Sequence, residues 1–154
     1  MKSPKPTHHI QQSEVIPYSP DEIYALVADI KRYPEFLPWC KGSRIKEAHE
    51  HEVIAELTMG FGFMQTAFTT RNRNRPGKEI RMELMEGPFE RLKGTWQFRP
   101  EDRKKTRVIL DLRFQFAEHK LEALFDSAFK KAMEQILTAF TQRAHALYGS
   151  SGSG

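Results

Sequence analysis

The sequence predicts one α+β domain in which a curved antiparallel sheet of about seven strands packs against a long C-terminal helix. Apolar and polar residues alternate with a period of two from residue 43 to residue 116, which is typical of strands with one buried face. An apolar stripe at helical spacing then runs over 120–148. Because such a sheet needs a cover and only this helix is long enough to provide it, we expect the helix to lie across the sheet.

The N-terminal part predicts one strand followed by two short helices. Residues 8–16 are the strand candidate. Ser19 can cap a helix, and the proline and two acidic residues that follow it suit a first helical turn, so we expect a helix over 20–30. Two prolines interrupt the apolar segment 33–39, which predicts a short helical turn or a loop there.

The central strands are separated by turns rich in glycine, proline and charged residues. The alternating runs are 53–59, 64–70, 80–84, 92–98 and 108–116. The charges of the terminal helix cancel, so we expect that helix to pack rather than to bind nucleic acid. The domain is expected to occupy residues 7–148. Residues 1–6 would be a flexible arm, and 149–154 a flexible tail with the composition of a cloning scar.

Composition and charge exclude several classes of protein. Hydrophobic residues make up 39% of the 154, enough for one core. The 24 Lys and Arg against 20 Asp and Glu leave a net charge of +4, which permits an anionic partner without requiring one. The single Cys40 excludes a disulfide framework or a multi-cysteine metal site and fits a reducing compartment. No apolar run reaches the length of a membrane span, and residues 1–12 lack the apolar region of a secretory signal.

No catalytic constellation is visible in the residues. The common nucleophile, zinc-protease and phosphate-loop motifs are missing from the sequence. Cys40 has no histidine near it in sequence and is best interpreted as a packing residue. His49 and His51 lie in a hydrophilic turn and are interpreted as solvated side chains rather than metal ligands. Most carboxylates alternate with apolar residues and so face outward. We therefore expect a binding protein without a metal or a cofactor, not an enzyme.

The order of a meander predicts two unlike ends of the sheet. Turns 61–63 and 87–89 carry phenylalanines and share one end, whereas the basic turns 73–78 and 99–105 share the other. The phenylalanines are either plugs of the core or the lip of a cavity. The basic turns are either solvated tips or a surface for ribosomal RNA or lipid head groups, and no aromatic residue interrupts them to stack on single strands. The predicted basic patch consists of Arg71, Arg73, Arg75, Lys78, Arg103, Lys104 and Lys105.

Several segments together resemble one known family. They are residues 18–40, 42–44, 68–72, 86–98, 110–116 and 139–149. In these segments the chain is similar to the coenzyme Q-binding START-like proteins, which belong to the polyketide cyclase/dehydrase superfamily and have the helix-grip (START/Bet v 1-like) fold. The resemblance extends over residues 13–149. Segments 37–41 and 147–149 look like the ubiquinone-binding branch, whereas 68–72 and 87–89 look equally like the bacterial ribosome association toxins.

The resemblance implies three alternative functions. The first is non-enzymatic binding of ubiquinone or another prenyl quinone in an apolar cavity, which would support respiration and ubiquinone biosynthesis. The second is a toxin that binds the large ribosomal subunit and blocks subunit joining. A polyketide cyclase is the third. For the quinone-binding protein and for the toxin we expect a bacterial cytoplasmic protein. The quinone-binding protein would also contact the inner face of the membrane peripherally. We expect no DNA partner for either of them.

A quinone site in this fold would lie between the sheet and the long helix. The expected entrance residues are Phe36, Leu37 and Trp39. The expected walls are Met82, Leu84, Trp96 and Leu112 on the sheet and Leu124, Phe125 and Ala128 on the helix. Lys41, Arg44 or Trp96 would donate a hydrogen bond to a ring carbonyl.

Overall fold

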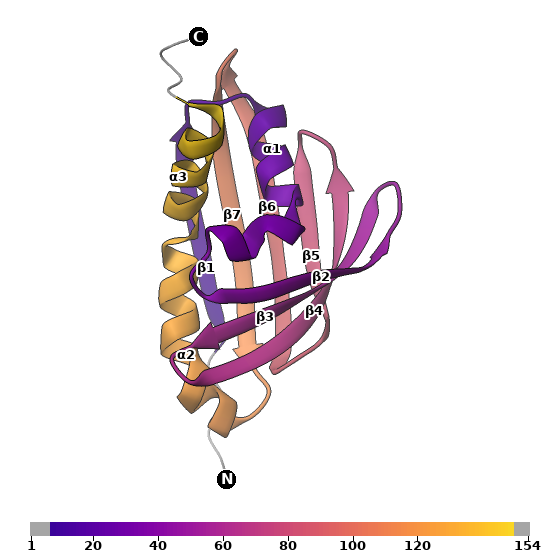
Figure 1. Cartoon of the computed structure of the whole chain (residues 1–154), viewed down its shortest axis with the longest axis vertical. Coiled ribbons are helices and arrows are strands. Elements are labelled where there is room, and N and C mark those ends of the chain that lie inside the picture. The colour runs from indigo at the N-terminus through magenta and orange to yellow at the C-terminus, as the bar shows by residue number, and fades with distance from the viewer. Residues whose placement is uncertain (1–6, 150–154) are drawn as a thin grey trace.

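Seven antiparallel strands form one curved sheet in the order β1-β7-β6-β5-β4-β3-β2, and the helices lie on its inner face (Figure 1). The computed structural model describes residues 7–149. The elements are β1 (His8–Ile16), α1 (Pro20–Ala28), the 3-10 helix η1 (Ile30–Glu35), β2 (Cys40–Ala48), β3 (Glu52–Phe61), β4 (Met64–Arg75), β5 (Glu79–Glu86), β6 (Phe89–Asp102), β7 (Lys105–Phe116), α2 (His119–Glu134) and α3 (Ile136–Tyr148). The arm predicted for residues 1–6 and the tail predicted beyond Gly149 lie outside the described residues.

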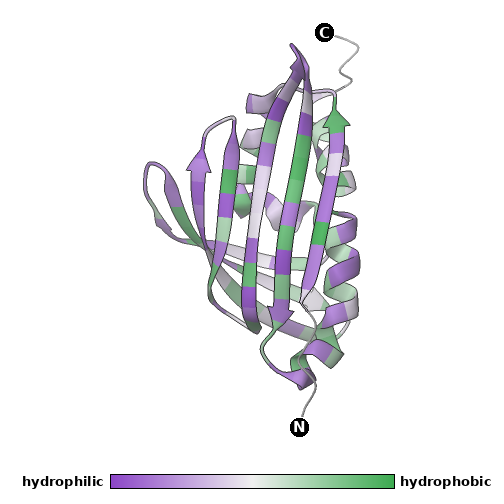
Figure 2. Cartoon of the chain, turned by 180° about the vertical axis from the view of Figure 1, so that it is seen from behind, coloured by the Kyte–Doolittle hydropathy of each residue, from purple (hydrophilic) through white to green (hydrophobic). Residues whose placement is uncertain are grey.

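The topology is the predicted meander, completed by the first strand. From β2 to β7 each strand pairs with the next one along the chain, and β1 pairs with β7 from His8 opposite Phe114 to Ile16 opposite Thr106. The turns β3–β4 and β5–β6 therefore share one end of the strands, and the turns β4–β5 and β6–β7 the other. Hydrophilic and hydrophobic residues alternate along the strands (Figure 2), and in β6 and β7 buried residues alternate with exposed or half-buried ones over most of the strand. This pattern is expected of a sheet that is covered on one face.

Helix α1 begins as its sequence predicts. The Ser19 side chain accepts a hydrogen bond from the Glu22 backbone N–H, and the Glu22 carboxylate accepts one from the Ser19 N–H, which completes a capping box. The helix ends at Ala28, two residues before the predicted boundary, because Asp29 leaves the helical conformation. Residues 30–35 then form η1, a 3-10 turn that contains Pro34.

The predicted single helix over 120–148 is in fact two helices that follow one another along the same side of the sheet (Figure 1). The break falls at Gln135, which has φ −105° and ψ 2°. No proline or glycine causes it. The Gln12 side chain on β1 donates a hydrogen bond to the carbonyl of Glu134, an acceptor that an uninterrupted helix would use for its own next turn. A contact from the other end of the chain thus stabilises the break.

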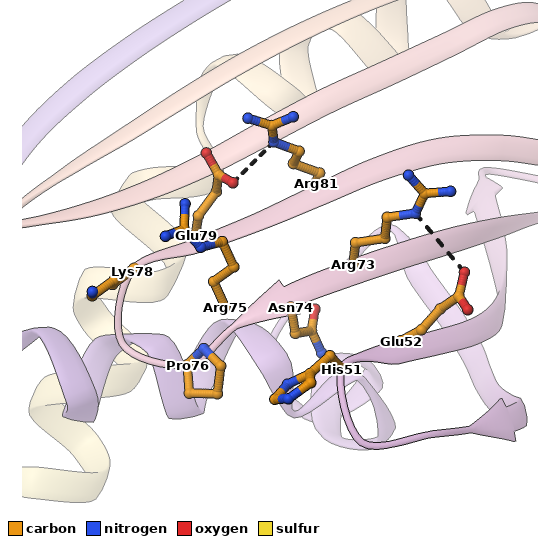
Figure 3. Close-up of a pocket in the computed structure, with 9 residues that line it drawn as sticks. All are labelled: His51, Glu52, Arg73, Asn74, Arg75, Pro76, Lys78, Glu79 and Arg81. Carbon is orange, nitrogen blue, oxygen red and sulfur yellow. Dashed lines mark hydrogen bonds and ion pairs between the residues drawn. The ribbon is translucent and has the colours of Figure 1, made fainter.

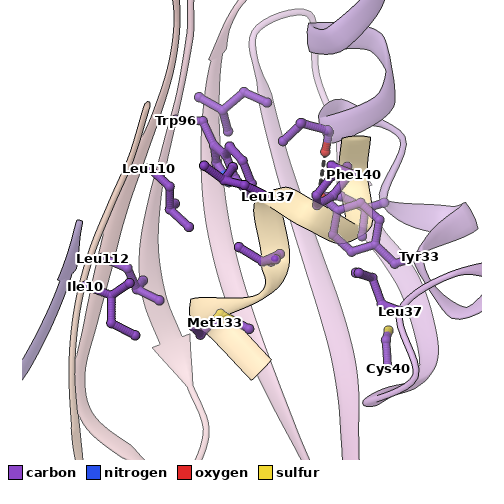
Figure 4. Close-up of a cluster of buried hydrophobic side chains, with 14 of the residues drawn as sticks. Ile10, Tyr33, Leu37, Cys40, Trp96, Leu110, Leu112, Met133, Leu137 and Phe140 are labelled. Carbon is purple, nitrogen blue, oxygen red and sulfur yellow. Dashed lines mark hydrogen bonds between the residues drawn. The ribbon is translucent and has the colours of Figure 1, made fainter. Parts of the chain in front are cut away.

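The core fills most of the space between the sheet and the helices. One cluster of aromatic rings joins α2 to β6 and β7: the Phe129 ring lies 4.8 Å from that of Phe114 and 5.2 Å from that of Phe89. A second cluster centres on Phe140 of α3, whose ring lies 5.3 Å from Trp96 and 5.5 Å from Tyr33. Figure 4 shows Trp96, Leu110 and Leu112 on the sheet facing Met133 and the neighbouring helical residues.

Candidate functional site

A small cavity of about 60 Å³ lies between the sheet and the helices. Its walls are mostly apolar and include Phe68, Met82, Trp96, Leu112, Phe129 and Met133. Pockets that hold small organic ligands usually measure about 300–1,000 Å³. The cavity between sheet and helix that the quinone hypothesis needs is therefore present, but by itself it is smaller than a bound quinone requires.

A much larger groove opens to the surface beside this cavity. It has a volume of about 780 Å³ and lies between the segment after η1, the β3–β4 turn and helices α2 and α3. Its apolar lining includes Phe36, Leu37, Trp39, Phe61 and Ala128. Polar side chains, among them Lys41, Lys131, Gln135 and Gln142, also line it. A groove of this composition suits a ligand with an apolar body and a polar end.

Trp39 and Ile136 separate the groove from the cavity. Both side chains line both spaces, and they are 8% and 7% exposed. Outward movement of these two side chains would join the two volumes without any change in the sheet.

A buried polar pair faces the cavity. The Thr70 hydroxyl donates a hydrogen bond of 2.9 Å to the Asn72 side-chain oxygen, and both residues are 6% exposed. This bond satisfies the amide oxygen and leaves the amide N–H donors of Asn72 for a water or a ligand. Neither residue was among those predicted from the sequence. The available signal was that Thr70 and Asn72 occupy positions on β4 where the alternation calls for apolar residues.

An arginine on α3 holds the edge of the groove in place. The Arg143 guanidinium lies 2.6 Å from the Glu35 carboxylate and 5.0 Å from the centre of the Phe36 ring. The hydrogen bond from Arg143 holds the pKa of Glu35 below its usual value. The η1 segment is thereby fastened to the helix that forms the opposite wall.

The structure brings together most of the predicted quinone-site residues, in two places rather than one. Trp39 lines both spaces. Phe36, Leu37, Lys41 and Ala128 line the groove, whereas Met82, Trp96 and Leu112 line the cavity.

Four of the predicted site residues line neither space and are corrected here. Leu124 is 42% exposed because the buried stripe of α2 runs through Phe125, Phe129 and Met133, one position away from it. Phe125 is buried against Phe116. Leu84 packs against the core near the end of β5. Arg44 is exposed and lies 3.6 Å from Glu56, so it cannot donate to a ligand in the interior.

The phenylalanines of the two apolar turns were interpreted as plugs of the core or as the lip of a cavity, and the structure contains both cases. Phe89 is a core residue, 4% exposed. Phe61 lines the groove, and Gly62 of the same turn lines it as well. Phe63 is fully exposed at the tip of this turn, beside the groove.

The basic β4–β5 turn borders a second hollow at the other end of the strands (Figure 3). It measures about 850 Å³ and lies between the β2–β3 and β4–β5 turns. It is lined by His51, Glu52, Arg73, Asn74, Arg75, Pro76, Lys78, Glu79 and Arg81. Arg81 pairs with Glu79 at 2.9 Å, whereas Arg75 and Lys78 form no ion pair within residues 7–149.

The predicted basic patch is therefore split. Arg73, Arg75 and Lys78 lie in this hollow, Arg71 lines a smaller one next to it, and residues 103–105 form the separate β6–β7 turn.

Gly77 allows the β4–β5 turn to lie against α1. Its φ is +72°, and a Cβ atom there would lie 2.4 Å from the Asp21 carboxylate.

Cys40, the cysteine considered as a nucleophile, is not activated. Burial raises the pKa of the Cys40 thiol to about 11, so the thiol is protonated at neutral pH and is a poor nucleophile. Its S–H points to the Gly42 carbonyl at 3.4 Å. Across residues 7–149 no three metal-binding side chains of the His, Cys, Asp or Glu type come together, and no helix is long and apolar enough to cross a bilayer.

The curved antiparallel sheet with C-terminal helices over an apolar interior defines the class of START-like helix-grip domains. The chain belongs to the family described as polyketide cyclase/dehydrase and lipid transport, whose model matches residues 16–141. Among solved structures, the Zhui aromatase/cyclase from Streptomyces sp. R1128 superposes with a TM-score of 0.79 at 16% identity, over 90% of this chain and 94% of that one. At that identity the likeness shows the fold alone.

Two relatives carry information about function. The ribosome association toxin RatA of Pseudomonas aeruginosa is 44% identical over 141 residues, which cover 92% of this chain and 98% of that protein. The mitochondrial coenzyme Q-binding protein COQ10 of Dictyostelium discoideum is 27% identical over 156 residues, which cover 97% of this chain and 76% of that protein.

Proposed function

We propose that this protein associates with the bacterial ribosome, binding the large subunit and hindering subunit joining. The observation that carries the proposal is the nearly full-length similarity to the ribosome association toxin RatA at 44% identity. From the sequence alone, this function was the second hypothesis, behind quinone binding. The comparisons support the reverse order, because the coenzyme Q-binding relative is more distant.

The geometry is consistent with a surface function. The cavity between the sheet and the helices is small, whereas Arg75 and Lys78 extend from an exposed turn with no carboxylate paired to them within residues 7–149. Cations in such a position can neutralise phosphates of ribosomal RNA. The protonated Cys40 thiol also favours a role without covalent chemistry. A protein of this kind would act in the cytoplasm, where ribosomes are assembled.

Sucrose-gradient sedimentation tests the proposal. Purified protein is added to a bacterial extract at a magnesium concentration that allows subunits to join, and fractions are probed for the protein. We expect it to sediment with the large subunit, and free subunits to accumulate at the expense of joined ribosomes. A gradient in which the protein stays at the top and the ribosome profile is unchanged would overturn the proposal.

A second candidate function is binding of a prenyl quinone or a similar lipid. The specific observation in its favour is the groove of about 780 Å³ that leads to the polar pair in the cavity across only Trp39 and Ile136. The tail would lie in the groove, and a ring carbonyl would accept from Asn72 once those two side chains move apart. The exposed Phe63 next to the groove could enter the membrane interface, where such a ligand resides.

A groove-blocking variant tests this second candidate. In Ala128→Trp the added indole would fill the groove, while Ala123→Trp adds the same ring at an exposed position of α2 that does not line it. We expect quinone, identified by mass spectrometry of a solvent extract, to copurify with wild type and the Ala123 variant but not with the Ala128 variant. Equal quinone in all three proteins, or none in any, would refute the candidate.

A further inference from the structure

The outer face of the sheet carries pairs of like charges directly opposite one another on neighbouring strands. Arg73 on β4 is opposite Arg81 on β5. On β6 and β7, Lys93 is opposite Arg113 and Arg99 is opposite Arg107. All six occupy outward positions of their strands, since each follows a buried residue on the strand, and five of the six are exposed while Arg107 is half-buried.

Such pairs weaken a sheet unless a counter-charge lies close by. Arg107 has Glu101 at 2.6 Å, and Arg81 has Glu79 at 2.9 Å. Arg73 has only distant partners: Glu52 and Glu83 are each 4.0 Å away from it.

The two carboxylates near Arg73 also lie closer to another arginine. Arg71 approaches Glu52 to 2.9 Å and Glu83 to 3.6 Å. Both acids are therefore shared, and the charge of Arg73 is only partly compensated. Lys93 forms no ion pair with any residue from 7 to 149. The outer face thus retains positive charge that the fold itself does not neutralise.

The hollows on this face connect these cations. A hollow of about 220 Å³ is lined by Arg71, Arg73, Arg81 and Lys93, among others, and it shares Arg73 and Arg81 with the larger basic hollow at the β4–β5 turn. Figure 3 shows Arg73 and Arg81 extending from adjacent strands on the same side of the sheet. A strip therefore runs from the β4–β5 turn across β5 to β6, and in it six arginines and lysines outnumber the three carboxylates of Glu52, Glu79 and Glu83.

The side chains of the strip indicate the chemistry of its partner. Five of the six residues in the like-charged pairs are arginine, whose planar fork of N–H donors matches phosphate oxygens. No aromatic side chain lies at the outward positions of β4 to β7, so the face lacks the aromatic rings that single-strand binding proteins use to stack unpaired bases. A partner with regularly spaced phosphates and stacked, inaccessible bases fits this surface best, and that is a double-helical RNA.

We propose that this outer face, through Arg73, Arg81 and Lys93, binds the phosphate backbone of double-helical ribosomal RNA. The inference rests on the proposed ribosome association and assigns it to the sheet rather than to the groove or the helices. The cost of the like-charged pairs is then offset when the protein is bound, since each phosphate lies between cations that repel one another in the free protein.

The test measures binding of the full chain to a fluorescently labelled RNA duplex of arbitrary sequence as salt is raised. The variant Arg73→Gln/Arg81→Gln removes one like-charged pair. The matched control Lys120→Gln/Lys130→Gln removes the same charge from exposed positions on α2, at the other side of the molecule. We expect the first variant to bind about tenfold more weakly or worse near about 150 mM salt and to lose about two units of the slope of log K against log salt. The control should change the slope by less than half as much.

A stability measurement separates this role from a structural one. Because the removed arginines repel each other, the thermal midpoint of Arg73→Gln/Arg81→Gln should be unchanged or raised while binding falls. Undiminished binding of this variant, or equal losses in the variant and the control, would overturn the inference. If polyglutamate bound as tightly as the RNA duplex, and Arg73→Gln/Arg81→Gln weakened both kinds of binding equally, the result would overturn the inference in favour of an acidic protein partner.

Ribosome sedimentation distinguishes failure of the inference from failure of the proposed function. If wild type does not sediment with ribosomes, the proposed function fails, and the inference fails with it. If wild type and Arg73→Gln/Arg81→Gln sediment equally well, ribosome association stands and only its assignment to this face is wrong. Sedimentation of wild type and of the α2 control, with loss of the sheet variant, supports both.

Discussion

Replacement of Ile136 by alanine tests whether this side chain forms the partition between cavity and groove. Ile136 lines both spaces and is 7% exposed, whereas Ile80 on β5 is 2% exposed and lines neither. Ile80→Ala therefore removes the same atoms from a closed part of the core. The comparison isolates the effect of position because the chemistry of the two substitutions is identical.

The expected cost follows from what each truncation leaves behind. Three methyl or methylene groups at about 0.8 kcal/mol each give roughly 2.4 kcal/mol for lost burial. In Ile80→Ala the space left behind is enclosed, so a cavity contribution raises the expected loss of unfolding free energy to about 3–5 kcal/mol. In Ile136→Ala the space opens to the groove, where the neighbouring side chains and water can occupy it, and we expect about 2–3 kcal/mol.

Urea unfolding followed by circular dichroism gives the two free energies, and fluorescence of an apolar dye reports access to the interior. We expect Ile136→Ala to lose less stability than Ile80→Ala and to be the only one of the two that binds more dye than wild type while folded. Greater destabilisation of Ile136→Ala without extra dye binding would refute the reasoning, since the residue would then be an ordinary part of a closed core.

Three further predictions concern single interactions. Because the pKa of Cys40 is raised from 9.0 to about 11, its thiolate fraction near pH 8 is about one hundredth of that in the unfolded chain, and a thiol reagent should label native protein at least that much more slowly. The Glu35–Arg143 pair, which lowers the pKa of Glu35, should stabilise the protein above the ordinary carboxyl pKa and cease to do so as pH falls through the lowered folded value. The stability difference between wild type and Glu35→Gln measured near neutral pH should therefore vanish in acid, and its persistence there would contradict the assignment. Thr70→Val should cost about 1–3 kcal/mol in urea unfolding by leaving the Asn72 oxygen unpaired, whereas Thr70→Ser should cost clearly less, and equal losses would show that the hydroxyl is not the cause.

The predictions from sequence succeeded where a local pattern determines the structure. Alternation along 108–116 places Leu110, Leu112 and Phe114 on the inner face, as observed, because side chains in a strand necessarily alternate between two faces. The Ser19 cap was likewise visible because all its parts lie within four residues. Leu124 was placed wrongly because several helical phases fit an apolar stripe that includes it.

The sequence by itself determined the strands, their inner faces, the first helix and the presence of an apolar end and a basic end. Each of these depends on residues adjacent in the chain or on the order in which strands follow one another. Only the tertiary structure decided where the terminal helix breaks, since the stabilising contact comes from Gln12, 122 residues away. It also decided the size of the interior and the like-charged pairs of the outer face, because packing volume and strand register arise only when distant segments meet.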